Sequence, residues 1–387
     1  MRILFTSLRI TSHFLPLVPF IEACRRRGHE VAVAAPRDLA ERVAKTGAAF
    51  FAVGHPGDEG LRPIWARLRG VSEGEATRIV IGEIFAGVSA AAALPDLLAA
   101  TETWRPSVVV RESQEYAAVL AAEKLGIPHL RVAITARTSD AELLSIAAPS
   151  VDRHGRGVGL SPDPSGERIR RETIFTLFPA SLEGPIVELS PARRFRPARR
   201  EPSPLPLPDW WGGGLADPVV YLTLGTVAGG MEAARSAYRV ALDAVAGLPI
   251  RVLLTIGAEL PMEMLDEVPS NVHVERFVPQ DDVFPHATAV LCHGGSGTVL
   301  GTLAAGVPLV VAPMFADQPN NAARIAAVGA GVAVPRNAPA EELRRALTRV
   351  LEEPSFRVAA RAVAAEMAAL PLVDEAAVDL ERLARPA

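Results

Sequence analysis

The sequence predicts an α/β protein with two doubly wound domains, and three observations lead to this class. Short apolar runs alternate with amphipathic helical stretches along the chain, which is typical of parallel sheets covered by helices. The same alternation starts again after a Pro- and Gly-rich segment at residues 202–217. The 387 residues suffice for two domains with full cores. Two such domains that face each other leave a cleft between the carboxyl edges of their sheets.

Residues 1–201 are expected to form the first domain, which opens with a β-loop-α-β unit. Apolar runs at residues 3–6 and 31–34 predict two buried strands. Residues 7–14 are expected to be the loop between the first strand and a helix that ends at Gly28. Because such crossovers are right-handed, the two strands should be parallel. Further strands of this domain are expected at residues 50–53, 107–110, 130–134 and 173–178.

Two longer segments of the first domain interrupt this alternation. Residues 56–100 have a helical pattern and are longer than a crossover requires. Residues 135–172 contain the patch GRGVGLSPDPSG, whose glycines and prolines predict an exposed loop. Four prolines and three glycines then make residues 202–217 an interdomain linker. The second domain is expected at residues 218–370, followed by a helical tail at 371–387 that packs back on the first domain.

Composition and charge limit the classes of function. The formal net charge of −4 gives no general attraction to nucleic acid, and the basic run at residues 193–200 is interpreted as a solvated surface segment. Cys24 and Cys292 each lie inside an apolar pattern, which predicts two buried thiols in a reducing cytosol. The N-terminal apolar stretch is too short for a signal peptide, and no long apolar span lacks an interrupting proline. We therefore expect a cytoplasmic protein without a membrane span.

Polar loops follow two neighbouring strands of the second domain. The apolar run at residues 289–292 predicts a buried strand, and HGGSGT follows it at residues 293–298. Its three glycines let the backbone approach a ligand closely, and the next helix directs its free N–H groups to the same place. A second strand at residues 307–313 leads to a loop with Asp317 and Gln318. Because ligands bind at the carboxyl edges of open α/β sheets, the sequence predicts a phosphate site here.

These motifs resemble those of the GT-B, family 1 nucleotide-sugar glycosyltransferases. The spaced combination of HGGSGT, GVPLVVAPMFADQPNNA and GAG is specific, whereas HGG alone would be weak. SHFLPLVPFIEACRRRGHEV near the N-terminus, TLGT at residues 223–226 and FVPQ at residues 277–280 also fall where the family has its motifs. Within the family, the chain is most similar to the actinobacterial branch that modifies polyketides, macrolides, enediynes and other natural products. The resemblance covers the whole chain and implies two Rossmann-like domains across a cleft.

The resemblance implies a donor site in the second domain for a dTDP- or UDP-sugar. Asp317 and Gln318 would bind the sugar hydroxyls, and Phe277 and the backbone of Val278 would border the nucleobase. The structural alternatives are a core position for Phe277, helix capping by Asp317 or Gln318, and an N-cap at Thr226. The family needs no metal and no bound cofactor. The residues expected to bind the donor diphosphate are Thr226, His293, Gly294, Gly295, Ser296, Gly297 and Thr298.

The resemblance assigns the acceptor half of the reaction to the first domain, with His13 as general base. His13 lies next to a helix N-terminus, whose dipole favours the neutral imidazole that accepts a hydroxyl proton. Attack by that hydroxyl on the sugar carbon inverts its configuration. Relatives place a carboxylate after a later strand to orient this histidine, and Glu112 stands there in this chain. The alternative for Glu112 is a favourable charge at a helix start.

Two features distinguish this acceptor half from the family pattern. Glu112 replaces the commoner Asp, and the loop after the first strand has LRITS at residues 8–12 in place of a Gly-rich run. The bulkier loop should narrow the acceptor side or bring Arg9 toward it. By analogy of fold, residues 56–100 and 135–172 should line an apolar pocket for a small lipophilic acceptor. A homodimer is an option, and no nucleic-acid partner is expected.

Three other classes of protein share parts of this pattern. A nicotinamide or flavin oxidoreductase needs Gly-x-Gly-x-x-Gly after its first strand, and TSLRITSHF at residues 6–14 contains no glycine. A sugar-nucleotide epimerase of related architecture has no need of the His13 motif. A nucleotide-sugar-binding partner without catalysis would not need His13, His293 and Asp317 together. The sequence therefore favours an inverting, metal-independent glycosyltransferase.

Overall fold

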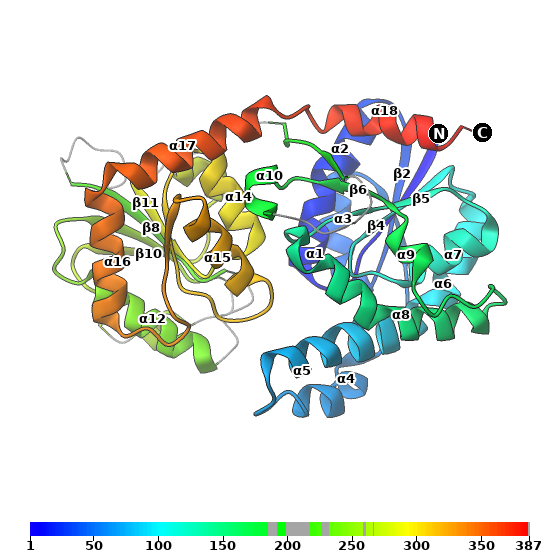
Figure 1. Ribbon diagram of the computed structural model, residues 1–387, viewed down its shortest axis with the longest axis horizontal. Coiled ribbons are helices and arrows are strands. Elements are labelled where there is room, and N and C mark those ends of the chain that lie inside the picture. The colour runs from blue at the N-terminus through cyan, green and yellow to red at the C-terminus, as the bar shows by residue number, and fades with distance from the viewer. Residues whose placement is uncertain (185–191, 199–216, 226–231, 258–260, 266, 386–387) are drawn as a thin grey trace. The chain divides into compact units, whose positions relative to one another are not determined.

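The computed structural model describes residues 1–184, 192–198, 217–225, 232–257, 261–265 and 267–385 (Figure 1). The chain forms two compact units. Unit 1 comprises Met1–Leu177, Pro185–Ala198 and Leu370–Ala387, and unit 2 comprises Phe178–Gly184 and Arg199–Ala369. Each unit has a parallel sheet with helices packed on it, so the predicted class of two doubly wound α/β domains is confirmed.

Within the described residues, the sheet of unit 1 has seven parallel strands in the order β3-β2-β1-β4-β5-β6-β7. They are β1 (Arg2–Thr6), β2 (Glu30–Ala35), β3 (Ala49–Ala52), β4 (Val108–Glu112), β5 (His129–Val132), β6 (Thr173–Thr176) and β7 (Ala192–Arg194). The chain runs outward from β1 to β3 and then returns to place β4 on the other side of β1. The loops after β1 and β4 therefore flank the strand-order reversal, where open α/β sheets bind ligands.

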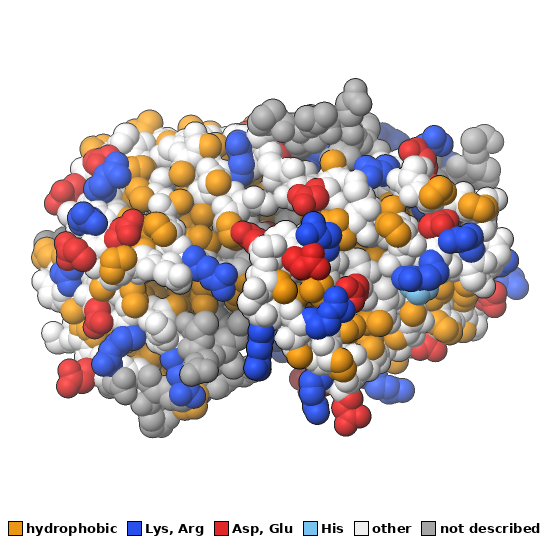
Figure 2. Space-filling model, turned by 60° about the horizontal axis from the view of Figure 1, so that its bottom comes forward, with side chains coloured by type: hydrophobic (Ala, Val, Ile, Leu, Met, Phe, Trp, Pro, Cys, Tyr) orange, Lys and Arg blue, Asp and Glu red, His pale blue; other side chains and the backbone are white. Residues whose placement is uncertain are grey.

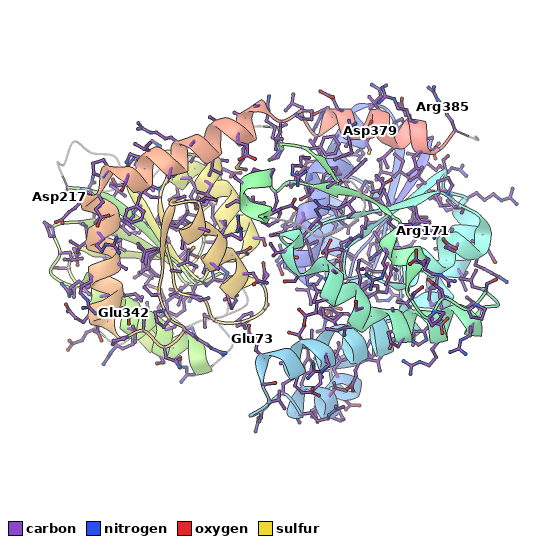
Figure 3. All side chains as sticks on the ribbon, viewed as in Figure 1. Glu73, Arg171, Asp217, Glu342, Asp379 and Arg385 are labelled. Carbon is purple, nitrogen blue, oxygen red and sulfur yellow. The ribbon has the colours of Figure 1, made fainter. Side chains whose placement is uncertain are left out.

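Helices cover both faces of this sheet, because strand side chains alternate between two apolar cores. The helices of unit 1 are α1 (Thr11–Phe14), η1 (Leu15–Leu17), α2 (Val18–Arg26), η2 (Arg37–Leu39), α3 (Ala40–Thr46), α4 (Gly57–Ala66), α5 (Glu73–Arg78), the π-helix η3 (Ile79–Ser89), α6 (Ala90–Trp104), α7 (Ala117–Leu125), η4 (Arg137–Ser139), α8 (Asp140–Gly157), α9 (Glu167–Arg170) and α18 (Asp374–Leu383). Ile3 and Phe5 of β1 pack in one core with α2 and α18, which lie side by side (Figure 1). Leu4 packs in the other core with η3, α6, α7 and α8. Asp379 of α18, labelled in Figure 3, pairs with Arg193 of β7 at 2.8 Å.

Over the part of unit 2 that the structure describes, the sheet has six parallel strands in the order β10-β9-β8-β11-β12-β13. They are β8 (Val219–Thr223), β9 (Arg251–Thr255), β10 (Val272–Glu275), β11 (Ala289–Cys292), β12 (Leu309–Val311) and β13 (Gly331–Ala333). The order reverses between β8 and β11, so the loops after these two strands flank the position expected for a ligand. Val220, Leu222 and Leu291 share one buried core with the two helices α12 (Glu232–Val245) and α16 (Ala340–Glu352).

The described helices of unit 2 include a short segment from the first half of the chain. Besides α12 and α16, they are α10 (Ala180–Glu183), η6 (Met262–Leu265), α13 (Gln280–Val283), η7 (Phe284–His286), α14 (Ser296–Ala304), α15 (Gln318–Ala327) and α17 (Pro354–Ala369). α10 packs on α15, where Arg324 donates to the carbonyl oxygens of Ser181 (2.8 Å) and Leu182 (3.2 Å). Residues 178–184 therefore belong to unit 2, whereas the sequence placed all of 1–201 in the first domain.

The predicted linker at residues 202–217 lies outside the described residues except for Asp217, which Figure 3 labels. The end of the chain, with α18, belongs to unit 1. Val373, Ala377 and Leu380 of this last segment are buried in the same core as Phe20 of α2. Packing of these apolar side chains accounts for the position of α18 in unit 1.

The structure corrects the predicted loop at residues 135–172. α8 runs for 18 residues, through Pro149 and into the Gly/Pro-rich patch. Leu144, Ala147 and Val151 of α8 are buried in the core beneath it, so apolar packing holds the helix through Pro149 and as far as Gly157, three residues into the patch. The rest of the patch, residues 158–166, forms neither helix nor strand, as predicted.

The expectations for two shorter segments were also wrong. Residues 7–14 are not loop throughout, because α1 begins at Thr11. The basic run at residues 193–200 is not simply solvated, because β7 extends the sheet there and Phe195 after it is fully buried. The ring of Phe195 packs against that of Phe175 with 5.0 Å between centroids. This aromatic contact holds the edge strand against the core.

Three features bear on the expectations from composition. One helical run, Glu73–Trp104, is long and apolar enough to cross a membrane by length and composition alone, and more than half of its most apolar window is buried inside the protein, as in a core helix. Cys24 and Cys292 are buried free thiols, as predicted. Lys and Arg side chains are interspersed with Asp and Glu over the face shown in Figure 2.

Candidate active site

His13 and Glu112 meet where the strand order of unit 1 reverses. Glu112 is the last residue of β4, and its side chain is fully buried (0% exposed). His13 lies in α1, after the loop that follows β1, and its side chain is 13% exposed. The His13 Nδ1 atom lies 3.0 Å from Glu112 Oε1, within hydrogen-bond distance. The structure therefore brings together the two residues that the sequence predicted as a catalytic pair.

Further hydrogen bonds hold the Glu112 carboxylate. Oε1 also accepts from the backbone N–H of Leu8 (3.4 Å), and Oε2 accepts from the N–H of Gln114 (2.6 Å). Because the carboxylate is an acceptor, the His13 ring donates through Nδ1–H and leaves Nε2 as a proton acceptor. The arrangement can therefore take a proton from a group that approaches Nε2.

The helix start after β4 is capped by another carboxylate. α7 begins at Ala117, and Glu115 accepts from the N–H groups of Ala117 (2.8 Å) and Ala118 (3.1 Å). Burial raises the pKa of Glu115, and the hydrogen bond from Thr6 acts in the opposite direction. Glu115 is thus the carboxylate that binds the free N–H groups at the start of this helix. The alternative that Glu112 only supplies a charge there is wrong.

An apolar ring and a neutralised loop surround His13. Phe85 of η3 meets the His13 ring edge-on, with 5.5 Å between ring centroids. Arg9, which the sequence placed near the acceptor, pairs with Asp38 (3.1 Å) and Asp58 (2.5 Å). The charge of this glycine-free loop is therefore neutralised by partners within unit 1.

In unit 2, the loop of residues 293–298 follows β11 at the reversal of strand order. Gly294 has φ +88°, and a Cβ there would lie 2.7 Å from the Val311 side chain, so glycine is required. Gly295 occupies the N-cap of α14, where no side chain caps the helix. Among the described residues, the backbone N–H groups of residues 296–298 have no hydrogen-bond partner. This open helix N-terminus is suited to bind an anion.

The imidazole of His293 is accommodated by two glycines. A Cβ at Gly225 or Gly295 would lie 2.7 Å or 2.5 Å from His293 Nε2. Burial lowers the pKa of His293 to about 4, with Asp317 and the Thr223 carbonyl acting in the opposite direction. The ring is therefore neutral at physiological pH and can donate one hydrogen bond.

Asp317 holds the glycine-rich loop in place. It occupies the N-cap position of α15, yet its side chain does not cap the helix. Instead, Asp317 Oδ2 accepts from Ser296 Oγ (2.6 Å) and from Asn321 Nδ2 (2.9 Å). Asn321 Nδ2 also donates to the carbonyl oxygen of Gly294 (2.9 Å). The side chains of Asp317 and Asn321 thus join α15 to the loop, and the capping alternative for Asp317 is wrong.

Gln318 is more deeply placed than its predicted role suggested. The residue is buried, with only 4% of its surface exposed. Its amide oxygen accepts from the N–H groups of Met314 (2.7 Å) and Phe315 (3.1 Å). The amide NH₂ is therefore the group of Gln318 that is left for a sugar hydroxyl.

Phe277 lies beyond the carboxyl end of β10 and is 72% exposed. The alternative of a core position is therefore wrong, and the ring is free to face a planar base. The adjacent Val278 is half-buried. The structure thus leaves the predicted nucleobase contacts accessible from solvent.

Two of the predicted phosphate contacts need separate comment. Gln280 Nε2 donates to the Thr298 hydroxyl (3.3 Å) and to the Tyr221 hydroxyl (3.2 Å), so the Thr298 side chain is bound within the protein. The group of Thr298 that remains to bind a phosphate is therefore its backbone N–H. Thr226 lies outside the described residues.

The sequence missed two residues of these sites. Asn321 is one helical turn beyond Asp317, a spacing that places both on one helix face, so a signal was present. Phe85 lies far from His13 along the chain, and no local spacing connects them. Their contact depends on how η3 packs on unit 1.

Known proteins are similar to this chain in sequence. The family model described as erythromycin biosynthesis protein CIII-like, C-terminal domain, matches residues 239–383, and the corresponding N-terminal domain model matches residues 22–150. An L-demethylnoviosyl transferase from Streptomyces niveus is 33% identical over 341 residues, which cover 87% of this chain and 86% of that protein.

Solved structures match over the full length. The glycosyltransferase SnogD from Streptomyces nogalater superposes with a TM-score of 0.80 at 29% identity, over 100% of this chain and 99% of its own. The glycosyltransferase VinC, solved in complex with dTDP, gives a TM-score of 0.78 at 27% identity, over 99% of both chains. Agreement of this extent identifies the class, and the protein is a glycosyltransferase of the GT-B fold.

Within that class, the chain belongs to the erythromycin biosynthesis protein CIII-like family of actinobacterial natural-product glycosyltransferases, as the resemblance predicted. Its general activity is glycosyl transfer. The alternatives of a sugar-nucleotide epimerase and of an inactive nucleotide-sugar-binding partner are therefore set aside.

Proposed function

We propose that the enzyme moves a sugar or a deoxysugar from a dTDP- or UDP-sugar to a hydroxyl of a small lipophilic natural product, with inversion at the sugar carbon. The observation that carries this proposal is the 3.0 Å contact between His13 Nδ1 and the buried Glu112 carboxylate. Such a contact holds one tautomer and one orientation of the imidazole, which prepares Nε2 to accept a proton.

In the proposed step, the acceptor hydroxyl gives its proton to His13 Nε2 while its oxygen attacks the anomeric carbon of the sugar. The bond between that carbon and the diphosphate oxygen breaks, and its electron pair leaves with the nucleoside diphosphate. Attack from the face opposite the leaving group inverts the carbon. The Glu112 carboxylate stabilises the imidazolium that forms.

Unit 2 would stabilise the leaving diphosphate. The N–H groups of residues 296–298, the positive end of the α14 dipole and one N–H of His293 are donors held in place before the reaction. Asp317 and the Gln318 amide would bind the sugar, and Phe277 and Val278 would border the base. The complex of VinC with dTDP supports a dTDP-linked donor.

We expect neither a metal ion nor a bound cofactor, because backbone donors and the helix dipole supply the charge stabilisation. Across the described residues, no group of three or more His, Cys, Asp or Glu side chains is placed to hold a metal ion. Metal independence stays a prediction, and so do a cytoplasmic location and a homodimer. Transfer measured with and without a chelator tests the first of these.

A cavity of about 680 Å³ in unit 1 bears on the acceptor. It lies between η3 and α8, within the segments 56–100 and 135–172 that were expected to line an acceptor pocket. Its apolar lining residues are Ile64, Val88, Ala91, Ile146 and Pro149. His13 and Glu112 are not among the lining residues, so use of this cavity by the acceptor stays a prediction.

A transfer assay tests the proposed reaction. The purified enzyme would be incubated with dTDP-glucose or UDP-glucose and a panel of hydroxylated aromatic and macrolide aglycones, and the products detected by mass spectrometry. We expect a product one hexosyl unit heavier than one of the aglycones, with inverted anomeric configuration by NMR. Retention of configuration would overturn the single-step mechanism.

A thermal-shift experiment tests the donor site separately. A ligand that binds only the folded protein raises its melting temperature. We expect dTDP or UDP to raise it and inorganic phosphate at the same concentration to have little effect. If neither nucleotide raised the melting temperature, the assignment of the α14 N-terminus to the donor diphosphate would be wrong.

A further inference from the structure

We propose that Arg111 is a positioning residue that keeps the Glu112 carboxylate at hydrogen-bond distance from His13. The inference rests on the proposed role of that pair. Arg111 precedes Glu112 in β4, and successive side chains of a strand point to opposite faces. Glu112 points to the face that carries His13. Arg111 points to the other face, where its guanidinium lies 5.3 Å from the ring centroid of Tyr116.

From that face, Arg111 binds the loop that follows Glu112. Arg111 Nη1 donates to the carbonyl oxygens of Glu112 (3.2 Å), Ser113 (2.9 Å) and Glu115 (3.1 Å). The same loop contains Gln114, whose N–H donates to Glu112 Oε2 (2.6 Å). The shape of the loop thus decides where Oε2 is held, and with it the orientation of Oε1 toward His13.

The other edge of the guanidinium is anchored by Glu172, which immediately precedes β6. Arg111 Nε donates to Glu172 Oε1 (2.9 Å), and Nη2 donates to Oε2 (2.5 Å). Both side chains are at most 1% exposed. Burial opposes ionisation of Glu172, yet Arg111 and His129 outweigh it and lower the pKa of Glu172 to about 2. The anchor is therefore a buried ion pair at neutral pH.

His129 extends this network to the surface. Its Nδ1 lies 3.0 Å from Glu172 Oε1, and its Nε2 lies 3.4 Å from Glu123 Oε1. Burial lowers the pKa of His129, but Glu123 and Glu172 more than offset this and raise it to about 9. Arg111 and His129 thus face the carboxylates of Glu172 and Glu123, so the buried charge of Glu172 is paired on both sides.

The side chain must be arginine for this role. Its planar fork offers one edge to Glu172 and a separate nitrogen to the loop carbonyls at the same time. A lysine ammonium is a single point that cannot reach both sets of acceptors. Arg111→Lys therefore keeps the buried cation but removes the bonds to the loop.

Arg131 supplies a matched control. It is the register partner of Arg111 in the adjacent strand β5 and is equally buried, at 1% exposed. Its Nη2 donates to Asp140 (2.8 Å), which lies at the start of α8 and not in the loop after β4. Arg131→Lys thus makes the same change at the same depth in the sheet.

The test is an NMR measurement on the full-length protein labelled with ¹⁵N-histidine. The His13 ring signals would be assigned by their loss in His13→Gln. We expect the wild type and Arg131→Lys to show His13 protonated at Nδ1. In Arg111→Lys we expect loss of this Nδ1–H signal and growth of the Nε2–H form. In the transfer assay, kcat should fall about 10- to 100-fold, as for a misplaced catalytic group, with KM for the nucleotide sugar unchanged.

Three outcomes would overturn the inference. A folded Arg111→Lys variant that keeps the wild-type Nδ1–H signal shows that Arg111 does not position the pair. Equal loss of the signal in Arg131→Lys shows general loosening of the sheet. If Arg111→Lys does not fold, Arg111→Met combined with Glu172→Met replaces it, because apolar replacement of a whole buried ion pair usually preserves folding. If that double variant folds and keeps the Nδ1–H signal of His13, this third outcome also overturns the inference.

The NMR signal does not depend on the proposed reaction. If His13→Ala left transfer unchanged, the general-base assignment would fail, while the His13 signal would still report whether Arg111 positions Glu112. If Arg111→Lys changed neither the signal nor kcat while His13→Ala abolished transfer, the positioning role alone would fail.

Discussion

The two units have the same topological feature and place different chemistry at it. In unit 2, the reversal between β8 and β11 presents backbone N–H groups and a neutral His293. In unit 1, the reversal between β1 and β4 presents His13, supported by buried charged residues that include Glu112 and Arg111. The unit 2 site offers mainly backbone dipoles to a ligand, whereas the unit 1 site depends on an ionisable pair.

This difference follows from what each half is proposed to do. A diphosphate brings its own charge, so backbone donors and a helix dipole suffice to bind it. A general base needs a partner that stabilises its protonated form, and a buried carboxylate in turn needs donors of its own. If the comparison holds, changes in unit 1 should lower the rate of transfer, and changes in the unit 2 loop should weaken donor binding.

The largest effect is expected from His13→Ala. Removal of a general base lowers kcat by about 10²- to 10⁴-fold. The affinity for dTDP, measured by calorimetry, should stay within about twofold of the wild type, since unit 2 is unchanged. The matched control is His286→Ala, a change at an exposed histidine of unit 2. A parallel loss of dTDP affinity in His13→Ala would break the division of roles between the units.

The charged network of unit 1 should make its stability depend on pH. Glu123 and Glu172 hold the folded pKa of His129 near 9, above its usual value of 6.5. Its contribution to stability is therefore fully present below about pH 6.5 and is lost as the pH rises through about 9. The loss is roughly 3 kcal/mol, from 1.36 kcal/mol per pKa unit. Urea unfolding of the wild type and of His129→Gln between pH 6 and 10 measures it. Parallel curves for the two proteins would contradict the assignment.

A smaller effect on rate is expected from Glu112→Gln. The amide oxygen can still accept from His13 Nδ1, but the negative charge that stabilises the imidazolium is gone. A hydrogen bond to a charged group contributes about 1.5–3 kcal/mol, so kcat should fall about 10- to 100-fold. Glu112→Asp keeps the charge and shortens the reach, and steady-state kinetics would separate the two requirements. Wild-type kcat in both variants would remove Glu112 from the mechanism.

The smallest effect is expected in the donor loop. In Gly295→Ala, the added Cβ would lie 2.5 Å from His293 Nε2, so the ring must shift away from the anion site. We expect dTDP to bind about tenfold more weakly, or about 1.4 kcal/mol, and kcat to fall by no more than a similar factor, because His293 is also proposed to stabilise the leaving diphosphate. Gly74→Ala in α5 is the control, because a Cβ there meets nothing within 4 Å. A lowered kcat with unchanged dTDP affinity would reverse the expected pattern.

Much of unit 2 could be predicted from local sequence. Buried parallel strands are short, largely apolar runs, and the runs at residues 219–224, 252–256 and 289–292 are strands β8, β9 and β11 within one or two residues. Strand β10 has the alternating sequence VHVE and is only half-buried. The loop at residues 293–298 carries its glycines and the start of its helix within six positions. A backbone anion site therefore leaves a local signature in the sequence.

The errors occurred where packing overrides local preference. α8 continues through Pro149 because its apolar face is buried, and β7 forms because Phe195 packs into an aromatic cluster. α10 belongs to unit 2 because Arg324 binds its carbonyl oxygens. Each of these contacts joins residues that are distant in the sequence, so a local pattern does not predict it.

The proposed catalytic pair, His13 and Glu112, shows the same limit most clearly. The residue types at positions 13 and 112 and the family motif around His13 could be recognised without coordinates. The 3.0 Å contact between His13 and Glu112, and the support from Arg111 and Glu172, depend on the adjacency of β1 and β4 and on the position of β6 two strands from β4. Apolar periodicity, glycines and helix starts act over a few residues, so the order of amino acids encodes them directly. Buried charges are stabilised by whichever partners the sheet order brings within hydrogen-bond distance, so their pairing is settled only when the strands are assembled.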